Sequence, residues 1–468
     1  GWGLHGPDTS PWSPSRPDLY RLTIRLTYEG EVIDEVGTYI ALREVEVRPD
    51  DSGHHRLYLN GEPLFQLGLL DQGYWPDGLY TAPTDEALRH DLEVTKDLGF
   101  NMVRKHVKVE PDRWYHHCDQ LGLLVWQDIP SGDRYIGPND PDYERTPEAA
   151  AIFEEEAEAI VRTKGWSPSI VSWVIFNEGW GQYDTARWAE RFRELDPTRI
   201  INSASGWTDR GVGDVLDLHA YPGPTSGDPG PDRAVVLGEF GGLGLPLAGH
   251  TWQDEANWGY RSYETAEQLT DAYVHLMKRL TPLVTTGLAA AVYTQTTDVE
   301  IEVNGVMTYD RARIKLDEER VRAAHAGVFD APTRIRPLVP SAGEDREARQ
   351  APYAAKAAVP TPKVRWRFTG EQPAEAWTTP AFDDRAWAGT SGGIGSDFTP
   401  RGLATADWPG ERVWARRSFD LFDGEDQTLV RYDSLEALPD DARLALSLDV
   451  GKVAHLAAEI AKQKGGQS

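Results

Sequence analysis

Eight short apolar runs alternate with amphipathic, helix-like stretches between residues 65 and 293, and this alternation constrains the fold more than any other feature. Two of the stretches between them, TDEALRHDLEVTKDLG and PEAAAIFEEEAEAIVRTKG, have helical periodicity, with Thr84 as the expected N-cap of the first and Gly99 as its stop. Eight βα units predict an α/β fold, a (β/α)8 TIM barrel with flanking β-sandwich pieces. A Rossmann-like sheet is the weaker alternative, because no Gly-x-Gly-x-x-Gly follows the first strand. The predicted strands lie at about 65–70, 100–104, 122–127, 171–176, 199–203, 214–219, 234–238 and 287–293.

The segments on either side of the barrel have a different composition. Residues 18–48 alternate apolar and polar side chains around a Glu-Gly turn, which is typical of half-buried antiparallel strands. A stretch rich in Pro, Ala and charge follows the barrel and predicts a linker. The predicted organisation is a partial β-sandwich at 1–48, the barrel at 49–328, a linker at 329–363, a small β-sandwich at 364–420 and a C-terminal tail at 421–468.

Charge and composition exclude several classes of partner. The chain has 48 Lys plus Arg against 75 Asp plus Glu, a net charge of −27, which disfavours nucleic acid and anionic membranes. No apolar run is long enough to span a bilayer, and the lone Cys118 cannot form an intrachain disulfide. The 17 Trp and 18 Tyr suit stacking on sugar rings as well as core packing. The opening GWGLHGPDTS suggests a trimmed chain, so localisation and oligomeric state stay open.

Two glutamates follow predicted barrel strands. Glu178 comes after the fourth strand in VSWVIFNEGW, and Glu239 after the seventh in AVVLGEFGG. Catalytic groups of such barrels lie where strands end at the C-terminal face, so the two carboxylates should meet across the mouth. A pair of this kind suits glycosidic cleavage, in which one carboxyl protonates the leaving oxygen and the other attacks or activates water. Helix capping or pairing with Arg is the structural alternative.

These motifs make the chain resemble glycoside hydrolase family 2, the family of β-galactosidases, β-glucuronidases and β-mannosidases. The similarity runs from about residue 11 to about residue 325 and includes LYLNGEPLFQLGLL, LGFNMVRKHVKVEPDRWYHHCDQLGLLVWQDIP, FNEGW and GEFGG. It implies that the first segment is immunoglobulin-like and that 364–420 is a sugar-binding-like module. It also implies a retaining exo-β-glycosidase with Glu178 as acid/base and Glu239 as nucleophile. A carboxyl separation of roughly 5–5.5 Å would fit retention, and one near 9 Å inversion.

The resemblance also assigns supporting roles. Asn177 matches the Asn that binds the sugar 2-hydroxyl, Arg104 an Arg that orients the nucleophile, and Tyr221 a Tyr that donates to it. No cofactor or metal is expected, since the adjacent His116 and His117 are poor co-ligands. Further candidates for substrate contact are His106, Trp126, Gln127, Asp128, Trp180 and His219, and, where the sequence departs from better-known members, Asp71 and Trp75.

The substrate remains open at this point. Tyr293, Thr294 and Gln295 stand where the family often has a Trp, and no charged pattern marks uronic acid recognition. The carbohydrate partner is therefore a galactoside by preference, with glucuronic acid, mannose and arabinose as the other sugars. Two other classes stay open: a carbohydrate-binding protein that has lost catalysis, and an endo-acting retaining barrel hydrolase.

Overall fold

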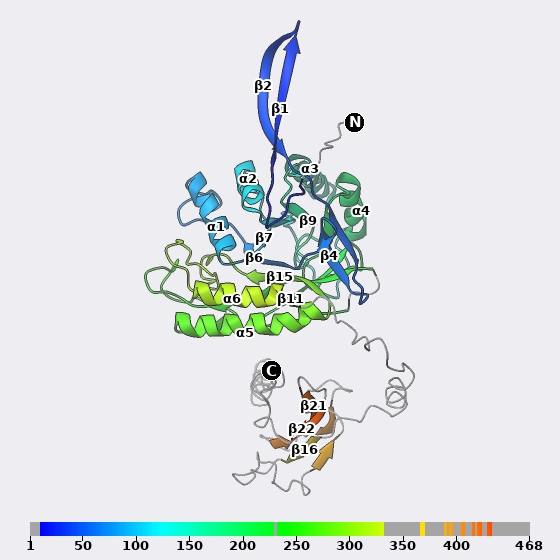
Figure 1. Ribbon diagram of the computed structural model, residues 1–468, viewed down its shortest axis with the longest axis vertical. Helices are drawn as coiled ribbons and strands as arrows, with labels where there is room; N and C mark the ends of the chain where they lie inside the picture. The colour runs from blue at the N-terminus through cyan, green and yellow to red at the C-terminus, as the bar shows by residue number, and fades with distance from the viewer. Residues whose placement is uncertain are drawn as a thin grey trace. The chain divides into compact units, whose positions relative to one another are not determined.

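The computed structural model of the protein describes residues 10–228 and 232–331, together with short strands between residues 366 and 432. The chain divides into two compact units, Gly1–Pro337 and Leu338–Ser468. Figure 1 shows the barrel within the first unit. None of the helices in the described residues has the length and apolarity needed to cross a membrane.

Eight parallel strands form a nearly closed barrel, in the order β10-β9-β8-β7-β6-β15-β12-β11. The ladder does not continue from β10 to β11 in the described residues. Instead Asn202 donates from Nδ2 to Asp217 Oδ2 at 2.6 Å, and Asp214 N donates to Ile201 O at 2.8 Å. All eight predicted strands are confirmed: β6 (Gln66–Asp71), β7 (Met102–Lys105), β8 (Leu124–Asp128), β9 (Ile170–Val174), β10 (Ile200–Asn202), β11 (Val215–Ala220), β12 (Ala234–Gly241) and β15 (Leu288–Thr294).

Helices surround this barrel unevenly. Thr84 Oγ1 accepts from Ala87 N at the start of the first helix and Gly99 follows its end with φ 89°, as predicted. Helices lie between several of the strands but not all: the loop at 203–214 between β10 and β11 contains none, and its three glycines with positive φ do not favour one. The helices are α1 (Asp85–Asp97), α2 (Asp112–Leu121), α3 (Pro147–Lys164), α4 (Thr185–Leu195), α5 (Ala266–Thr285) and α6 (Glu318–Phe329).

Three hydrophobic clusters hold this architecture together. Two lie between strands and helices, one around α5 and α6 and the other around α1 to α4. The third combines strand residues such as Met102, Leu124 and Trp126 with Trp12 and Leu57 from the segment that precedes the barrel. The barrel interior is therefore a packed core and not a pore.

The N-terminal segment forms a long hairpin of β1 (Tyr20–Tyr28) and β2 (Glu31–Ile40), which projects from the barrel in Figure 1. Its turn is at the predicted Glu29 and Gly30, whose φ values of 51° and 88° match a two-residue hairpin turn. Residues 21–38 are all exposed, whereas the alternating pattern predicted half-buried strands. Within the described chain no face of this part of the hairpin is covered, so an immunoglobulin-like sandwich at 1–48 stays a prediction.

Smaller sheets complete the described structure. In the second unit the predicted sandwich at 364–420 coincides with several of the strands β16 to β22, but their assembly as a sandwich stays a prediction, and residues 332–365 and 433–468 lie outside the described residues. The remaining strands are β3 (Val45–Pro49), β4 (His55–Leu59), β5 (Glu62–Pro63), β13 (Leu243–Gly244), β14 (Arg261–Ser262), β16 (Trp366–Thr369), β17 (Ala388–Thr390), β18 (Gly393–Gly395), β19 (Ala404–Asp407), β20 (Trp414–Arg416), β21 (Phe419–Asp423) and β22 (Thr428–Tyr432).

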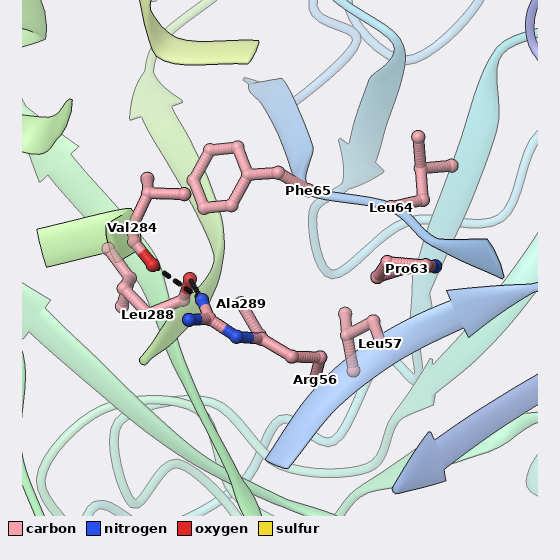
Figure 2. A pocket seen from close by; sticks show the side chains of 8 residues that line it. All are labelled: Arg56, Leu57, Pro63, Leu64, Phe65, Val284, Leu288 and Ala289. Atoms are coloured by element: carbon pink, nitrogen blue, oxygen red, sulfur yellow. Dashed lines mark hydrogen bonds between the residues drawn. The ribbon is translucent and has the colours of Figure 1, made fainter. Parts of the chain in front are cut away.

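Arg56 of β4 joins the antiparallel β3–β4–β5 sheet to the end of the barrel where β15 begins. Its guanidinium donates to Val284 O at 2.5 Å and to Leu288 O at 3.1 Å, and it pairs with Asp50 at 2.9 Å. Figure 2 shows this side chain in a small pocket with apolar walls, far along the strands from the predicted catalytic ends. The pocket is a structural joint, because its one charged side chain is already fully engaged.

Replacing Arg56 by Leu should therefore destabilise the barrel. The change leaves buried carbonyls and the Asp50 carboxylate without their donor, which costs about 3–5 kcal/mol of unfolding free energy. Chemical unfolding measures this loss. The matched Arg48→Leu change removes an exposed guanidinium of the neighbouring strand and should cost less than about 1 kcal/mol; equal losses in both variants would contradict the assignment.

Candidate active site

Glu178 stands at the open end of β9, in a backbone conformation that few residues adopt. Its φ is 54°, and its N–H donates to Ser205 O at 2.9 Å across the top of β10. Gly179 follows with φ 82°, and a Cβ there would lie 2.3 Å from Ile136 O. The Asn-Glu-Gly sequence thus turns the chain sharply away from the strand and leaves the carboxylate at the barrel mouth.

Glu239 of β12 meets Glu178 across this mouth. Glu178, His219 and Glu239 each place one side-chain oxygen or nitrogen within 4.8 Å of those of the other two. Among the described residues, one group of three or more His, Cys or carboxylate side chains lies close enough together to hold a cation, and it consists of these three. The predicted convergence of the two carboxylates is what the geometry shows.

Four side chains around Glu239 keep it charged, and two of them, Tyr221 and Arg104, also orient it. Tyr221 donates from its hydroxyl to Glu239 Oε2 at 2.6 Å, and its oxygen lies 2.7 Å from Thr294 Oγ1. Arg104 Nη1 lies 3.4 Å from Glu239 Oε1. Burial alone would raise the pKa of Glu239, but the positive charges of His219, His106 and Arg104 and the Tyr221 bond outweigh it and lower that pKa.

Arg104 is wholly buried and links four strand ends. Its Nε and Nη2 each bind one oxygen of Asp128 at 3.0 Å, and Nη2 also donates to Asn177 Oδ1 at 2.8 Å. Burial opposes the charge of Arg104, yet Asp128 and Glu239 raise its pKa above the usual value. Asp128 also accepts from Val107 N at 3.2 Å, and burial is again outweighed, so its pKa is lowered.

His219 bridges the two glutamates from β11. Its Nδ1 lies 2.8 Å from Glu178 Oε1 and 3.5 Å from Glu239 Oε2, and its Nε2 lies 2.7 Å from Ser205 Oγ. Burial would lower its pKa, but the Glu239 charge, the Glu178 hydrogen bond and Asp217 together raise it. Since both ring nitrogens are occupied, His219 acts on the carboxylates and has no free donor for substrate.

Several predicted contact residues lie away from the carboxylates. Trp126 is buried in the barrel core and donates to Gln66 Oε1 at 2.7 Å, while Asp71 accepts from Lys105 Nζ at 2.6 Å. Trp75 is also buried and packs under the Arg311 guanidinium, 3.9 Å from its ring centroid. These three side chains are buried against partners of their own, and their contact with substrate stays a prediction.

Other predicted residues do reach the site. His106 is partly buried, with Nδ1 3.1 Å from Asp128 Oδ2. Trp180 is 50% exposed and lies 5.4 Å from the Tyr135 ring, at the rim beside Glu178. Gln127, in contrast, points away from the site: it is buried and accepts from Tyr115 on the outer side of β8.

Sequence reasoning missed residues that loops deliver. Tyr260 stacks on Tyr221 with ring centroids 3.6 Å apart, and Gly242 makes room for the stack, because a Cβ there would lie 2.3 Å from the Tyr260 ring. Trp207 lies 5.9 Å from the His219 ring. Glu302 stands close enough to Glu239 for that charge to affect its pKa. None of these follows a strand directly, so no positional signal marked them.

Comparison with known proteins identifies this arrangement. Residues 56–221 match the description "Glycosyl hydrolases family 2, TIM barrel domain", and residues 4–43 match "Glycosyl hydrolases family 2". Residues 56–221 thus form a TIM barrel domain of glycosyl hydrolases family 2. It is 28% identical to a β-galactosidase of Photobacterium profundum over 46% of the chain and 20% of that protein. It is also 28% identical to a putative β-glucuronidase of Formosa agariphila, over 56% of the chain and 24% of that protein. The chain thus spans about a fifth to a quarter of these family members.

Solved structures agree on the architecture. A family 2 β-galacturonidase from Eisenbergiella tayi superposes with a TM-score of 0.54 at 20% identity, covering 69% of this chain and 61% of that one. β-Glucuronidase 2 of Bacteroides uniformis gives 0.53 at 21% identity, covering 69% and 42%. At such identities the likeness shows the fold alone.

Removal of the Arg104 charge should reverse the pH dependence of stability that comes from Asp128 and Glu239. In the parent, Asp128 and Glu239 have lowered pKa values, so they stabilise the fold above their unfolded pKa of about 4 and lose this as pH falls through the lowered values. In Arg104→Met no guanidinium offsets the burial of these two carboxylates. Their pKa values in the folded protein should therefore rise, so that the folded variant binds protons more readily than the unfolded chain. We expect a loss of about 3–5 kcal/mol at pH 7 that narrows on acidification.

Urea unfolding at pH 7.5 and pH 5 measures this. Arg187→Met, which removes an exposed guanidinium beside Glu154, is the control and should change little at either pH. A loss in Arg104→Met that is the same at both pH values would show that the guanidinium does not compensate the two carboxylates.

Proposed function

We propose that this protein is a retaining β-glycosidase that removes terminal β-linked sugars by double displacement, with galactosides as the preferred class. The observation that carries the proposal is the close pair of carboxylates, in which Glu239 is held ionised. One oxygen of each carboxylate lies within 4.8 Å of the other, which is nearer to the roughly 5–5.5 Å between carboxyl groups of retaining enzymes than to the roughly 6.5–9.5 Å of inverting ones.

In the first step Glu239 attacks the anomeric carbon and the glycosidic bond breaks. Glu178 gives its proton to the leaving oxygen, so the aglycone departs as an alcohol and the sugar stays as an ester of Glu239. In the second step Glu178, now a carboxylate, takes a proton from water, which displaces Glu239 at the same carbon. The sugar leaves with its original configuration, and both carboxyl groups return to their starting protonation.

Asn177 is suited to bind the sugar next to this centre. Its Oδ1 is engaged by Arg104, which fixes the amide plane and directs Nδ2 away from the guanidinium. An oriented amide donor there can bind the sugar 2-hydroxyl, an interaction that strengthens as charge develops at the anomeric carbon. Arg104 therefore orients both the nucleophile and a substrate donor.

His219 controls where the acid proton lies. Glu178 must carry a proton to act as an acid, and Nδ1 of a neutral His219 can accept a hydrogen bond from that carboxyl group while Nε2 donates to Ser205. When His219 is protonated instead, Glu178 is the carboxylate that accepts from it. Before the first step the pair thus holds one proton that either residue can carry; it leaves with the aglycone, and the water of the second step restores it.

A carbohydrate leaving group is supported by the exposed rim aromatics beside Glu178. Trp180 and Trp207 are 50% and 44% exposed, and such faces stack on sugar rings. This observation is compatible with exo action on oligosaccharide ends and also with the endo-acting alternative. A binding protein without catalysis is less well supported, because the charge and hydrogen bonds around Glu239 serve a nucleophile.

Substitution of each glutamate should produce a distinct kinetic signature. Glu239→Ala removes the nucleophile and should lower kcat by about 10⁴-fold or more. Glu178→Gln removes the acid and should cost about 10²–10⁴-fold on nitrophenyl β-galactoside, but much less on a dinitrophenyl glycoside, whose departure needs no proton. Hydrolysis of a panel of aryl β-glycosides, with galactoside, glucuronide, mannoside and arabinoside members, measures both.

Added azide separates the two roles further. It should form an α-glycosyl azide with Glu239→Ala and a β-glycosyl azide with Glu178→Gln. Glu190→Gln on exposed α4 removes a charge elsewhere and should leave turnover unchanged. Cleavage that survives in Glu239→Ala without azide would refute the mechanism, and binding of glycosides without any cleavage by the parent would favour the binding-protein alternative.

The pH profile should respond to His219. The lowered pKa of Glu239 places the acidic limb of kcat/KM below the ordinary carboxyl range, because kcat/KM falls only when the free nucleophile is protonated. His219→Asn keeps a polar side chain at this position but removes a positive charge. The pKa of Glu239 should therefore rise, and the acidic limb of kcat/KM should move to higher pH. An unchanged limb, measured with the dinitrophenyl substrate, would contradict this.

A further inference from the structure

Four side chains form a directed chain of hydrogen bonds across the ends of β6 and β15. Gln72 Nε2 donates to Gln295 Oε1 at 2.9 Å, and Gln295 Nε2 donates to Asn304 Oδ1 at 2.8 Å. Asn304 Nδ2 then donates to Glu302 Oε1 at 2.8 Å. Each amide fixes the orientation of the next, so the chain ends on a carboxylate whose position is set by three side chains.

This carboxylate belongs to the same mouth as the catalytic pair. Gln295 directly follows Thr294, which contacts Tyr221 beside the nucleophile. On the other side, backbone bonds tie Trp258 to residues 301 and 303, with Trp258 N donating to Ile301 O and Val303 N to Trp258 O, both at 2.9 Å. Trp258 and Tyr260 lie edge to face at 5.4 Å, so Glu302 stands beside the aromatic wall that stacks on Tyr221.

The surroundings of Glu302 disfavour another negative charge. Burial and the nearby charge of Glu239 raise its pKa, with the Asn304 bond and His106 opposing. The neighbouring lysines are engaged elsewhere: Lys105 and Lys108 bind Glu110 at 3.0 and 2.8 Å, and Lys315 binds Asp298 at 2.6 Å. A sugar carboxylate at this wall would face like charge, whereas sugar hydroxyls can donate to an oriented carboxylate.

We propose that Glu302, oriented by Gln295 and Asn304, is a specificity-determining residue that accepts a hydrogen bond from a hydroxyl of a neutral terminal sugar and excludes uronates. This rests on the proposed function and narrows its substrate class. The nucleophile and acid perform the same chemistry on either kind of sugar, so selection falls to the loop wall.

Binding of two inhibitors that differ only at one carbon tests the proposal. Galacto-configured isofagomine and its 6-carboxylate share the ring nitrogen that pairs with the catalytic carboxylates but differ in charge at C6. We expect the parent to bind the neutral compound about 100-fold or more tightly than the carboxylate. Glu302→Gln should weaken binding of the neutral compound about 10- to 100-fold, because a charged acceptor is lost. The ratio between the affinities for the two compounds should therefore become smaller. Calorimetry measures both affinities without any turnover.

Two further variants sharpen the result. Glu300→Gln removes an exposed carboxylate two residues away and should leave the ratio unchanged, whereas Asn304→Ala, which releases Glu302 from its donor, should narrow it. Equal or tighter binding of the carboxylate by the parent, or a ratio that Glu302→Gln does not alter, would overturn the proposal. If the parent protein binds the neutral inhibitor more tightly but does not hydrolyse aryl glycosides, the glycosidase activity is refuted. The role of Glu302 in selecting neutral sugars would then still stand.

Discussion

The buried guanidinium of Arg104 is the interaction on which the rest of the site depends. A cation with no exposed surface is tolerable only when acidic partners surround it, and Asp128 and Glu239 supply them from two different strands. The same group positions Asn177 from a third strand. Because the planar fork offers several donors in fixed directions, one residue fixes the relative positions of Glu239 and the Asn177 amide. A lysine, with one compact ammonium group, would not make these bonds together.

Residues whose roles follow from their place on a strand were predictable from sequence. The eight apolar runs marked the barrel strands, the strand-end rule singled out Glu178 and Glu239, and the family resemblance added Tyr221. The rule did not tell which of three successive candidates reaches the end of β8. Trp126 points into the packed interior, Gln127 points outward and only Asp128 reaches that end. Period-two alternation explains this, but the register of a short, fully buried strand is not visible in its sequence.

Loop residues were not predictable for a different physical reason. Tyr260 and Glu302 lie 42 residues apart in sequence (302 − 260), on irregular segments with no periodicity. Their meeting depends on backbone pairing between residues 258 and 301–303, and on Gly242, which leaves space for the Tyr260 ring. Such contacts arise from tertiary packing, and no local propensity encodes them. The exposed hairpin is a related case, because its pattern specifies strands without specifying what covers them.

The division between strand ends and loops separates chemistry from selectivity. Groups at the strand ends, such as Glu239 and Arg104, are held by buried ion pairs whose loss would destabilise the barrel itself, so their positions tolerate little change. Glu302 is held by neutral amides on loops, where substitution costs less and leaves the nucleophile in place. Under the proposal, the sugar that the site accepts can therefore change while the carboxylate pair stays fixed.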